Sequence, residues 1–444
     1  MKILLVQLPT SHFGAKELVY PLGLSRLSSL VPDEYLKHVL DMNLYVDPWE
    51  KLHGVMKDVR PDIVLLSFRN IDPLAGHQTS YISSLKTPAK MIRAMVPGAK
   101  IIVGGPAFTL FAKRLLMEIP EIDYGISGEG EVVFQEMLKT PFELEKIPGL
   151  IWKNRGDILH NRSWEKTDLD SLPMIDAEFF RPSDYLGKNQ YVAVMGIEGK
   201  RGCDLKCSYC TYPYLGGGQL RLRSPVKIVD ELEYLKKGYG VRLFHFTDSV
   251  VNRPADHFRA VCQEIIRRKL DIEWTGFFRE TDLTGELLDL AVSSGLMAVY
   301  FSGDALTDDG LKVLNKGMTK KDIINAARIT AKNGILTMCH FLINLPGETL
   351  DHFHEASGTI DEILEIHAPA GNLGAVIFNN IRLYPNAPIT NRLIRNGVLS
   401  PETDLLFPVY YNPEKTSHFL HHLESKCHEA GVFSRLSISK TEVF

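Results

Sequence analysis

The stretch KRGCDLKCSYCTYP at residues 200–213 holds three of the six cysteines of this 444-residue chain. Cys203, Cys207 and Cys210 are spaced C-x3-C-x2-C and follow a short apolar segment that we expect to form a strand. A loop after a strand can fold three thiolates toward one point, where they hold three irons of a cubane cluster and leave the fourth open. Structural zinc usually takes four ligands, and the other three cysteines are isolated, so the spacing favours the cluster over zinc.

Strand-like and helix-like runs alternate downstream of the cysteines, which is typical of a parallel sheet built from βα units. The expected strands lie at residues 192–195, 242–247, 272–278, 298–302, 335–343 and 375–382. Six βα units are too few for a closed eight-stranded barrel. We therefore predict a partial barrel over residues 190–385 and a small, mostly helical cap over residues 386–444.

The same alternation covers residues 1–140 and predicts an α/β fold with a Rossmann-like, doubly wound parallel sheet. The expected strands lie at residues 2–7, 38–41, 62–67, 100–104 and 124–127. A ligand of such a sheet binds outside the carboxyl ends of the strands. Residues 141–189 contain scattered prolines and predict a linker with a small hairpin, because residues 154–157 supply turn chemistry.

The composition narrows the class of protein. The chain is 45% hydrophobic and 23% charged, with a net charge of −4, which does not fit a nucleic-acid-binding protein. No apolar run reaches the roughly 18 residues of a membrane span, and the opening MKILLVQLP is too short for a signal peptide. Six cysteines are too few for a disulfide scaffold, so we expect a cytoplasmic enzyme of several domains.

The cysteine spacing, with the aromatic Tyr209 before the last cysteine, resembles that of the radical S-adenosylmethionine (SAM) enzymes. The resemblance implies that Cys203, Cys207 and Cys210 bind a [4Fe-4S] cluster. It further implies that SAM chelates the open iron through its amino and carboxylate groups. Tyr209 is then expected to contact SAM.

Later motifs match the same family in order along the chain. Asp248 ends the second barrel strand, where the family binds the methionine ammonium of SAM. Ser302 and Asp304 resemble an acidic motif of the fourth strand that contacts SAM, with Asp in place of the usual Glu. The methionine carboxylate requires a cation, for which Arg279 and Lys316 are the candidates.

The amino-terminal region resembles the cobalamin-binding domain of one large class of radical SAM enzymes. The resemblance implies that residues after four of the expected strands surround the corrin ring, namely Pro9, Thr10, Ser67, Arg69, Asn70, Asp72, Gly104, Gly105, Pro106, Gly128, Glu129 and Glu131. The D-x-H-x-x-G motif whose His binds cobalt is absent, because residues 41–44 read DMNL. A domain of this fold that binds no ligand is the alternative.

Both resemblances together imply a cobalamin-dependent radical SAM methyltransferase that acts on an unactivated centre of a small-molecule or peptide substrate. One SAM would methylate the cobalamin, and a second would generate the substrate radical. An electron donor such as flavodoxin or ferredoxin is the expected partner. The alternatives are a cyclase or rearrangement enzyme without net methylation, transfer of a SAM-derived group without an adenosyl radical, and a corrinoid or cluster carrier protein.

Overall fold

The computed structural model describes residues 1–10, 18–72, 79–140, 146–161, 166–188, 193–413, 416 and 419–436. The chain divides into two compact units. The front unit comprises Met1–Pro73 and Thr79–Met195, and the barrel unit comprises Leu74–Gln78 and Gly196–Phe444. Each unit contains its own large sheet, and each is described by itself below.

The front unit is a doubly wound sheet, as its sequence predicts. In the described residues its strand order is β2-β1-β3-β4-β5-β6-β7, and the neighbours from β2 through β5 pair in parallel. The parallel strands are β1 (Lys2–Gln7), β2 (Leu36–Asp41), β3 (Ile63–Ser67), β4 (Lys100–Gly104) and β5 (Tyr124–Ile126). The order reverses between β1 and β3, which makes this edge the switch point where doubly wound sheets bind their ligands.

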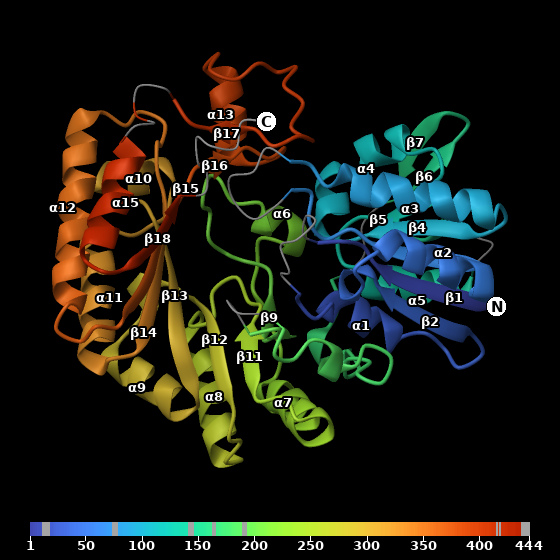
Figure 1. Ribbon diagram of the computed structural model, residues 1–444, viewed down its shortest axis with the longest axis horizontal. Helices are drawn as coiled ribbons and strands as arrows, with labels where there is room; N and C mark the ends of the chain where they lie inside the picture. Colours follow the sequence, from blue (N-terminus) through green and yellow to red (C-terminus); the bar gives the residue numbers. More distant parts are fainter. Residues whose placement is uncertain are drawn as a thin grey trace. The chain divides into compact units, whose positions relative to one another are not determined.

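Helices pack along the sheet of the front unit (Figure 1). They are α1 (Leu22–Ser28), α2 (Pro48–Val59), α3 (Ile82–Met95), α4 (Pro106–Glu118) and α5 (Glu131–Lys139). Residues 3–6 of β1 are fully buried, in keeping with a central strand that is covered on both faces. The core of the unit therefore follows from the continuous apolar run at the start of the chain.

The predicted hairpin is present and extends the front sheet. Its strands are β6 (Leu150–Asn154) and β7 (Asp157–His160), and β6 pairs antiparallel with β5. The turn residues Arg155 and Gly156 both have positive φ, at 50° and 95°, as a two-residue hairpin turn requires. Part of the segment that we assigned to a linker thus belongs to the sheet of the front unit.

The barrel unit contains an open, curved parallel sheet. In the described residues its order is β18-β15-β14-β13-β12-β11-β8. The strands are β8 (Met195–Ile197), β11 (Leu243–Phe246), β12 (Glu273–Phe278), β13 (Leu296–Asp304), β14 (Leu336–Leu342), β15 (Leu373–Asn379) and β18 (Phe433–Leu436). Two short antiparallel pairs accompany it, β9 (Lys200–Arg201) with β10 (Arg221–Leu222) and β16 (Ile381–Arg382) with β17 (Tyr410–Tyr411).

Helices follow the outer side of this sheet in chain order (Figure 1). They are α7 (Pro225–Tyr239), α8 (Ala255–Arg267), α9 (Gly285–Ser293), α11 (Lys320–Asn333), α12 (Leu350–His367) and α15 (Phe419–Glu429), with the shorter α6 (Tyr212–Gly216), α10 (Asp308–Val313) and α13 (Pro388–Arg395) in connections. The partial barrel that the sequence predicts is confirmed. The expected first strand, residues 192–195, is β8 at Met195–Ile197, and its first residue lies outside the described residues.

The carboxy-terminal segment differs from the expected helical cap in one respect. It contains α13 and α15, but it also supplies β18, which pairs in parallel with β15. A strand of four residues carries too little periodicity to be recognised beside a helix. Ser434 is held in this strand because its hydroxyl donates to Val376 O over 2.8 Å.

Alternating burial separates two faces of the barrel sheet. In β14, Cys339 and Phe341 are buried beneath the helices, while Met338 and His340, which alternate with them, are partly accessible. Side chains alternate between the faces of a strand, so the partly accessible set shares the concave inner face. The inner face is therefore less covered than the helix-covered outer face.

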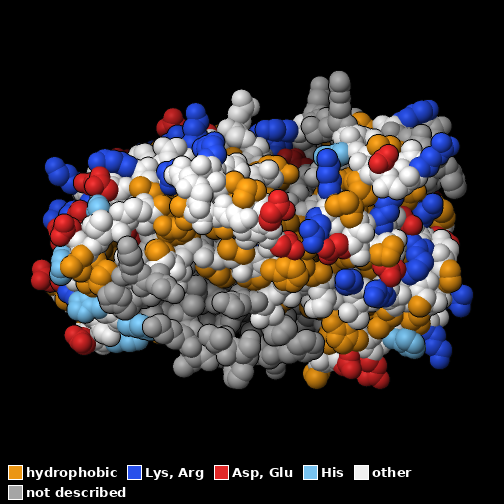
Figure 2. Space-filling model, turned by 90° about the horizontal axis from the view of Figure 1, so that it is seen from above, with side chains coloured by type: hydrophobic (Ala, Val, Ile, Leu, Met, Phe, Trp, Pro, Cys, Tyr) orange, Lys and Arg blue, Asp and Glu red, His pale blue; other side chains and the backbone are white. Residues whose placement is uncertain are grey.

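Charge is mixed over the surface. Figure 2 shows Lys and Arg side chains interspersed with Asp and Glu side chains on the face that it draws, which agrees with the net charge of −4. No helix among the described residues is both long enough and apolar enough to cross a membrane.

Candidate functional site

The cysteine loop, residues 203–210, starts at a position that only glycine fits. Gly202 has a φ of +84°, and a Cβ built there would lie 2.1 Å from Gln219 O. The amide of the next residue, Cys203, donates to Gly217 O over 3.0 Å. Gly202 thus lets two backbone segments approach closely and sets the entry of the loop.

We expect Gly202→Ala to displace the cysteine loop and to lower the free energy of unfolding by at least about 1–2 kcal/mol, the cost of a left-handed non-glycine residue. Urea unfolding measures the loss, and iron content after anoxic reconstitution measures the displacement. Gly218→Ala is the matched control, because a Cβ there meets nothing within 4 Å. Equal stability and equal iron content of the two variants would contradict this assignment.

Main-chain contacts hold the loop against the segment that follows α10. Ser208 donates through its amide to Leu314 O over 2.8 Å and through its hydroxyl to Val313 O over 3.0 Å. The side-chain amide of Asn315 donates to Lys206 O over 2.8 Å. Elements far apart in the sequence therefore fix the loop, so its three sulfurs do not depend on the loop alone for their placement.

The three thiols lie close enough to influence one another. Burial raises the pKa of Cys210 to about 12, and the neighbouring Cys207 and Cys203 add to this rise. Burial also raises the pKa of Cys207, while the positive charges of Lys316 and Arg279 act to lower it. The two cations therefore favour the thiolate form of Cys207 that binds iron, although burial outweighs them and the pKa of this thiol is raised.

A single metal ion requires ligands that converge on one point, whereas a cluster does not. Among the residues that the structure describes, no group of three or more His, Cys, Asp and Glu side chains is arranged to hold one metal ion. In a cubane each of the three cysteines binds a different iron, so its ligands need not converge on one ion.

Asp304 joins the cysteine loop to a buried lysine. Its Oδ2 accepts hydrogen bonds from the Tyr209 hydroxyl and from Lys316 Nζ, the latter over 2.5 Å. Lys316 Nζ also donates to Ser302 O over 2.8 Å. Burial would lower the pKa of Lys316, but the negative charges of Asp304, Cys207 and Glu280 together raise it. The structure thus brings Tyr209, Ser302 and Asp304 together, and their contact with SAM stays a prediction.

Arg279 lies beside this cluster with part of its guanidinium unpaired. Its Nη2 donates to Lys316 O over 2.6 Å and to Gly317 O over 3.1 Å, and its Nε donates to Thr281. Its Nη1 is buried and has no hydrogen-bond partner. A buried, unpaired guanidinium nitrogen fits an incoming carboxylate, so of the two candidate cations Arg279 is the better placed.

Asp248 is already engaged by the backbone. Its Oδ1 accepts from the amides of Gly199 and Lys200 over 2.8 and 3.1 Å, and only 3% of the residue is exposed. Burial raises the pKa of Asp248 to about 6, against the opposing effect of Lys200. These contacts favour a positioning function, in which Asp248 fixes the turn before the cysteine loop. Its contact with the SAM ammonium stays a prediction.

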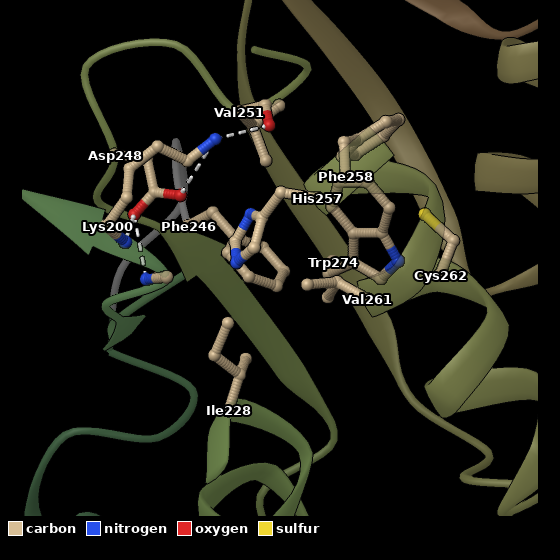
Figure 3. A pocket seen from close by; sticks show the side chains of 11 residues that line it. Lys200, Ile228, Phe246, Asp248, Val251, His257, Phe258, Val261, Cys262 and Trp274 are labelled. Atoms are coloured by element: carbon tan, nitrogen blue, oxygen red, sulfur yellow. Dashed lines mark hydrogen bonds and ion pairs between the residues drawn. The ribbon is translucent and has the colours of Figure 1, made fainter. Parts of the chain in front are cut away.

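Asp248 also borders the small cavity that Figure 3 shows. Lys200 and Asp248 lie at one side of it, and His257, Phe258 and Trp274 line the rest. The cavity admits only about 10 Å³ of water-sized molecules, too little for a cofactor. Lys200 is anchored here because its ammonium donates to the carbonyls of Val250, Val251 and Arg253 over 2.6–3.1 Å.

Glu280 is a buried acid that the sequence analysis did not single out. It is 3% exposed, and its Oε1 has no hydrogen-bond partner. Its carboxyl lies close to Gly303 and Ile323, which are both apolar. A Cβ built on Gly303 would lie 3.3 Å from Glu280 Oε1 and 3.3 Å from the Ile323 side chain. Burial raises the pKa of Glu280 to about 7. Only its place directly after Arg279 could have drawn attention to it.

We expect the raised pKa of Glu280 to make the protein less stable as the pH rises toward 7. Folding takes up a proton between the unfolded pKa near 4.5 and the folded pKa near 7, so the stabilisation is complete below pH 4.5 and is lost through pH 7. The effect is on the order of 3 kcal/mol. Glu280→Gln should flatten this slope in urea unfolding between pH 5 and 8, and an unchanged slope would contradict the assignment.

The residues predicted to bind cobalamin gather at the switch point of the front sheet. Asn70 donates to Thr10 O over 2.9 Å, which ties the segment after β3 to the segment after β1. Gly105 has a φ of +107°, and a Cβ there would lie 2.6 Å from Phe68 O. The other predicted residues lie at or after the ends of β1, β3, β4 and β5: Pro9, Ser67, Arg69, Asp72, Gly104, Pro106, Gly128, Glu129 and Glu131. Their contact with the corrin stays a prediction.

Two residues that support this surface were missed. The Asn43 carbonyl accepts from the Thr10 amide over 2.8 Å, while its amide donates to Leu8 O and to Asp41. The Thr109 hydroxyl accepts from the Gly128 amide over 3.0 Å. Asn43 belongs to the DMNL stretch, in which we noted the missing His but did not identify its hydrogen-bonding function.

Comparisons with known proteins agree with both units. The family model of the radical SAM superfamily matches residues 197–360, and that of the B12 binding domain matches residues 15–138. An uncharacterised methyltransferase of Pyrococcus horikoshii is 27% identical over 79% of this chain and 75% of its own length. A tryptophan 2-C-methyltransferase of Streptomyces laurentii is 25% identical over 74% of this chain and 65% of its own length.

Among solved structures, the radical SAM methyltransferase TsrM of Kitasatospora setae, with tryptophan and a SAM analogue bound, is similar to this chain. The TM-score is 0.82 at 21% sequence identity, and the alignment covers 100% of this chain and 92% of that protein. At this level of identity the likeness establishes the fold.

Proposed function

Because this chain belongs to the radical SAM superfamily and also carries a B12-binding domain, we propose that it is a cobalamin-dependent methyltransferase. The observation that carries the proposal is the buried site beside the cysteine loop, where Asp304 pairs with Lys316 and Arg279 offers an unpaired nitrogen. The names of the two curated relatives, both methyltransferases, support the reaction type.

The proposed cofactors divide the chemistry between them. A bound [4Fe-4S] cluster would supply the electron for SAM cleavage, and bound cobalamin would carry the methyl group. Cys203, Cys207 and Cys210 would hold the cluster, and Arg279 would bind the methionine carboxylate through Nη1. Burial of the Asp304–Lys316 pair keeps water from the site and fixes Tyr209 through its hydroxyl. The cobalamin would bind at the switch point of the front sheet.

The remaining parts of the proposal concern partners and boundaries. The substrate is a small molecule or a peptide with an unactivated centre, and a flavodoxin or ferredoxin supplies the electron. We place the protein in the cytoplasm, because free thiols and a cluster suit a reducing compartment. The domain boundaries at residues 1–140, 141–189, 190–385 and 386–444 stay a proposal, although the second segment adds β6 and β7 to the front sheet and the last adds β18 to the barrel sheet.

We expect Arg279→Lys to weaken SAM binding by about 10- to 100-fold, because lysine keeps the charge but loses the planar pair of donors. Calorimetric titration of the reconstituted protein with SAM measures the change. The control is Arg259→Lys, whose side chain pairs with Glu286 on the surface. Equal affinity of the two variants would remove Arg279 from the SAM site.

Product mass tests the reaction itself. A methyltransferase adds about 14 Da to the substrate and consumes SAM, whereas a cyclase or rearrangement enzyme leaves the mass without a methyl gain. Transfer of deuterium from labelled substrate into 5′-deoxyadenosine shows whether the adenosyl radical forms. A reconstituted protein that binds cobalamin and a cluster but never cleaves SAM would be a carrier, and the proposal would then be wrong.

A further inference from the structure

Four aromatic rings line the inner face of the barrel sheet on adjacent strands. His245 lies on β11, Phe277 on β12, Tyr300 on β13 and His340 on β14. The His245 ring lies 5.7 Å from that of Phe277 and 5.9 Å from that of Tyr300, between centroids. Phe277 also contacts Tyr300 at 5.7 Å and His340 at 6.1 Å. The rings therefore form one continuous aromatic wall across these strands.

The register of the sheet places this wall on the inner face. Phe277 pairs with Tyr300, while the neighbouring pair of Phe278 and Phe301 points to the buried, helix-covered side. On that outer side Phe278 contacts Phe258 of α8, with ring centroids 5.7 Å apart. His245, Phe277 and His340 are only partly buried, whereas their outward neighbours are fully buried. Three rings of the aromatic wall are thus more accessible than their outward neighbours, and the fourth, Tyr300, is 8% exposed.

The aromatic wall is uncharged at neutral pH. Burial lowers the pKa of His245 to about 4, and burial lowers the pKa of His340 as well, against a small opposing effect of Asp304. Both imidazoles are therefore neutral. Thr275, Met338 and Ile377 of the same face carry no charge, and the charged group that acts on the wall is Asp304, beside His340.

The same face of the sheet also carries groups that form or accept hydrogen bonds. His245 Nδ1 is engaged with Thr275 Oγ1 over 2.8 Å, which orients the ring. Asn379, on the same face of the next strand, β15, has a buried Oδ1 with no hydrogen-bond partner. A buried carbonyl without a donor costs free energy unless a ligand supplies the donor.

We propose that the aromatic wall binds the reacting part of the substrate as a flat, uncharged aromatic ring that donates a hydrogen bond to Asn379. Rings favour edge and stacked contacts with such a ring, and the four rings of the wall offer no counter-ion to a charged group that loses its hydration against them. The inference rests on the proposed function, because it names the substrate class of that same site. Phe277 and His340 are then determinants of specificity.

Three probes of matched size test the proposal on the full, reconstituted chain. They are 2-naphthol, decahydro-2-naphthol and 2-naphthoate, which differ in aromaticity and in charge. Calorimetric titration should give 2-naphthol the highest affinity, with each of the other two weaker by about three- to tenfold or more. Equal affinity for the saturated alcohol, or a higher affinity for the carboxylate, would overturn the proposal.

Variants place the binding on the aromatic wall. Phe277→Leu and His340→Leu should each weaken 2-naphthol binding by about threefold or more. The control is His421→Leu on α15, whose side chain is 52% exposed and lies outside this face. Thermal unfolding identifies a variant that fails to fold, and the other variant then decides. A folded Phe277→Leu or His340→Leu protein that binds 2-naphthol like the control would overturn the proposal.

The result that would contradict the proposed function differs from the one that would contradict the substrate class. SAM titration of the same proteins should be unchanged in both wall variants, since Arg279 lies outside the wall. If the unaltered chain binds SAM but not 2-naphthol, only the substrate class is wrong. If it binds 2-naphthol but not SAM, the proposed function is wrong and the aromatic wall stands.

Discussion

Cys207→Ala protein is expected to hold no intact cluster after anoxic reconstitution. Cys207 is buried, its loop is held by α10 and by the segment that follows it, and no other described cysteine lies in that loop apart from Cys203 and Cys210. Two thiolates cannot replace three in a cubane, so iron, inorganic sulfide and SAM cleavage should all fall to background.

Cys262→Ala is the matched control for this experiment. Cys262 is also buried, but it lies on α8 of the outer layer beside Trp274, as Figure 3 shows. Its iron and sulfide contents should equal those of the unaltered protein. Full iron and sulfide content in Cys207→Ala, or zinc in place of iron in the unaltered protein, would refute the cluster and with it the radical SAM chemistry.

Asp304→Asn is expected to lower the free energy of unfolding by about 3 kcal/mol or more, since it leaves a buried lysine charge without its counter-ion. Lys316 and Asp304 are 7% and 9% exposed at their side chains and lie 2.5 Å apart. Asn keeps the shape and tolerates the positive φ of 63° at this position. Urea unfolding at pH 7 measures the loss.

A second variant separates charge from geometry. Lys316→Met in the Asp304→Asn background removes the stranded ammonium and should restore much of the lost stability. Asp309→Asn is the control, because Asp309 pairs with Lys312 at the surface and its loss should leave the unfolding midpoint unchanged. If Asp304→Asn and Asp309→Asn unfold alike, the buried pair contributes nothing to stability.

Local sequence was sufficient for most of the fold. The apolar runs at β1 and β4 predicted those strands to the residue, because central parallel strands are continuously hydrophobic. The turn at Arg155 and Gly156 was predictable from turn chemistry alone. Strand β18 was not, since four residues after a helix are recognised only by the partner strand that they meet.

The candidate site likewise has features that local sequence predicts and features that it does not. The spacing of Cys203, Cys207 and Cys210 was enough to predict a cluster loop, because a ligand set within eight residues is a local property of the chain. Local sequence could not predict whether the Asp248 carboxylate faces a ligand or the backbone. This depended on the amides of Gly199 and Lys200, which lie 49 and 48 residues away in sequence.

The chain by itself thus determined the two parallel sheets and the three thiolates, because hydrophobic periodicity and ligand spacing act over a few neighbouring residues. Only the tertiary structure decided which charged groups are paired. It joined Asp304 to Lys316, left one nitrogen of Arg279 unpaired and aligned four rings on one face of the barrel. These contacts join separate strands and loops, and burial sets their strength, so they exist only once the sheet has formed.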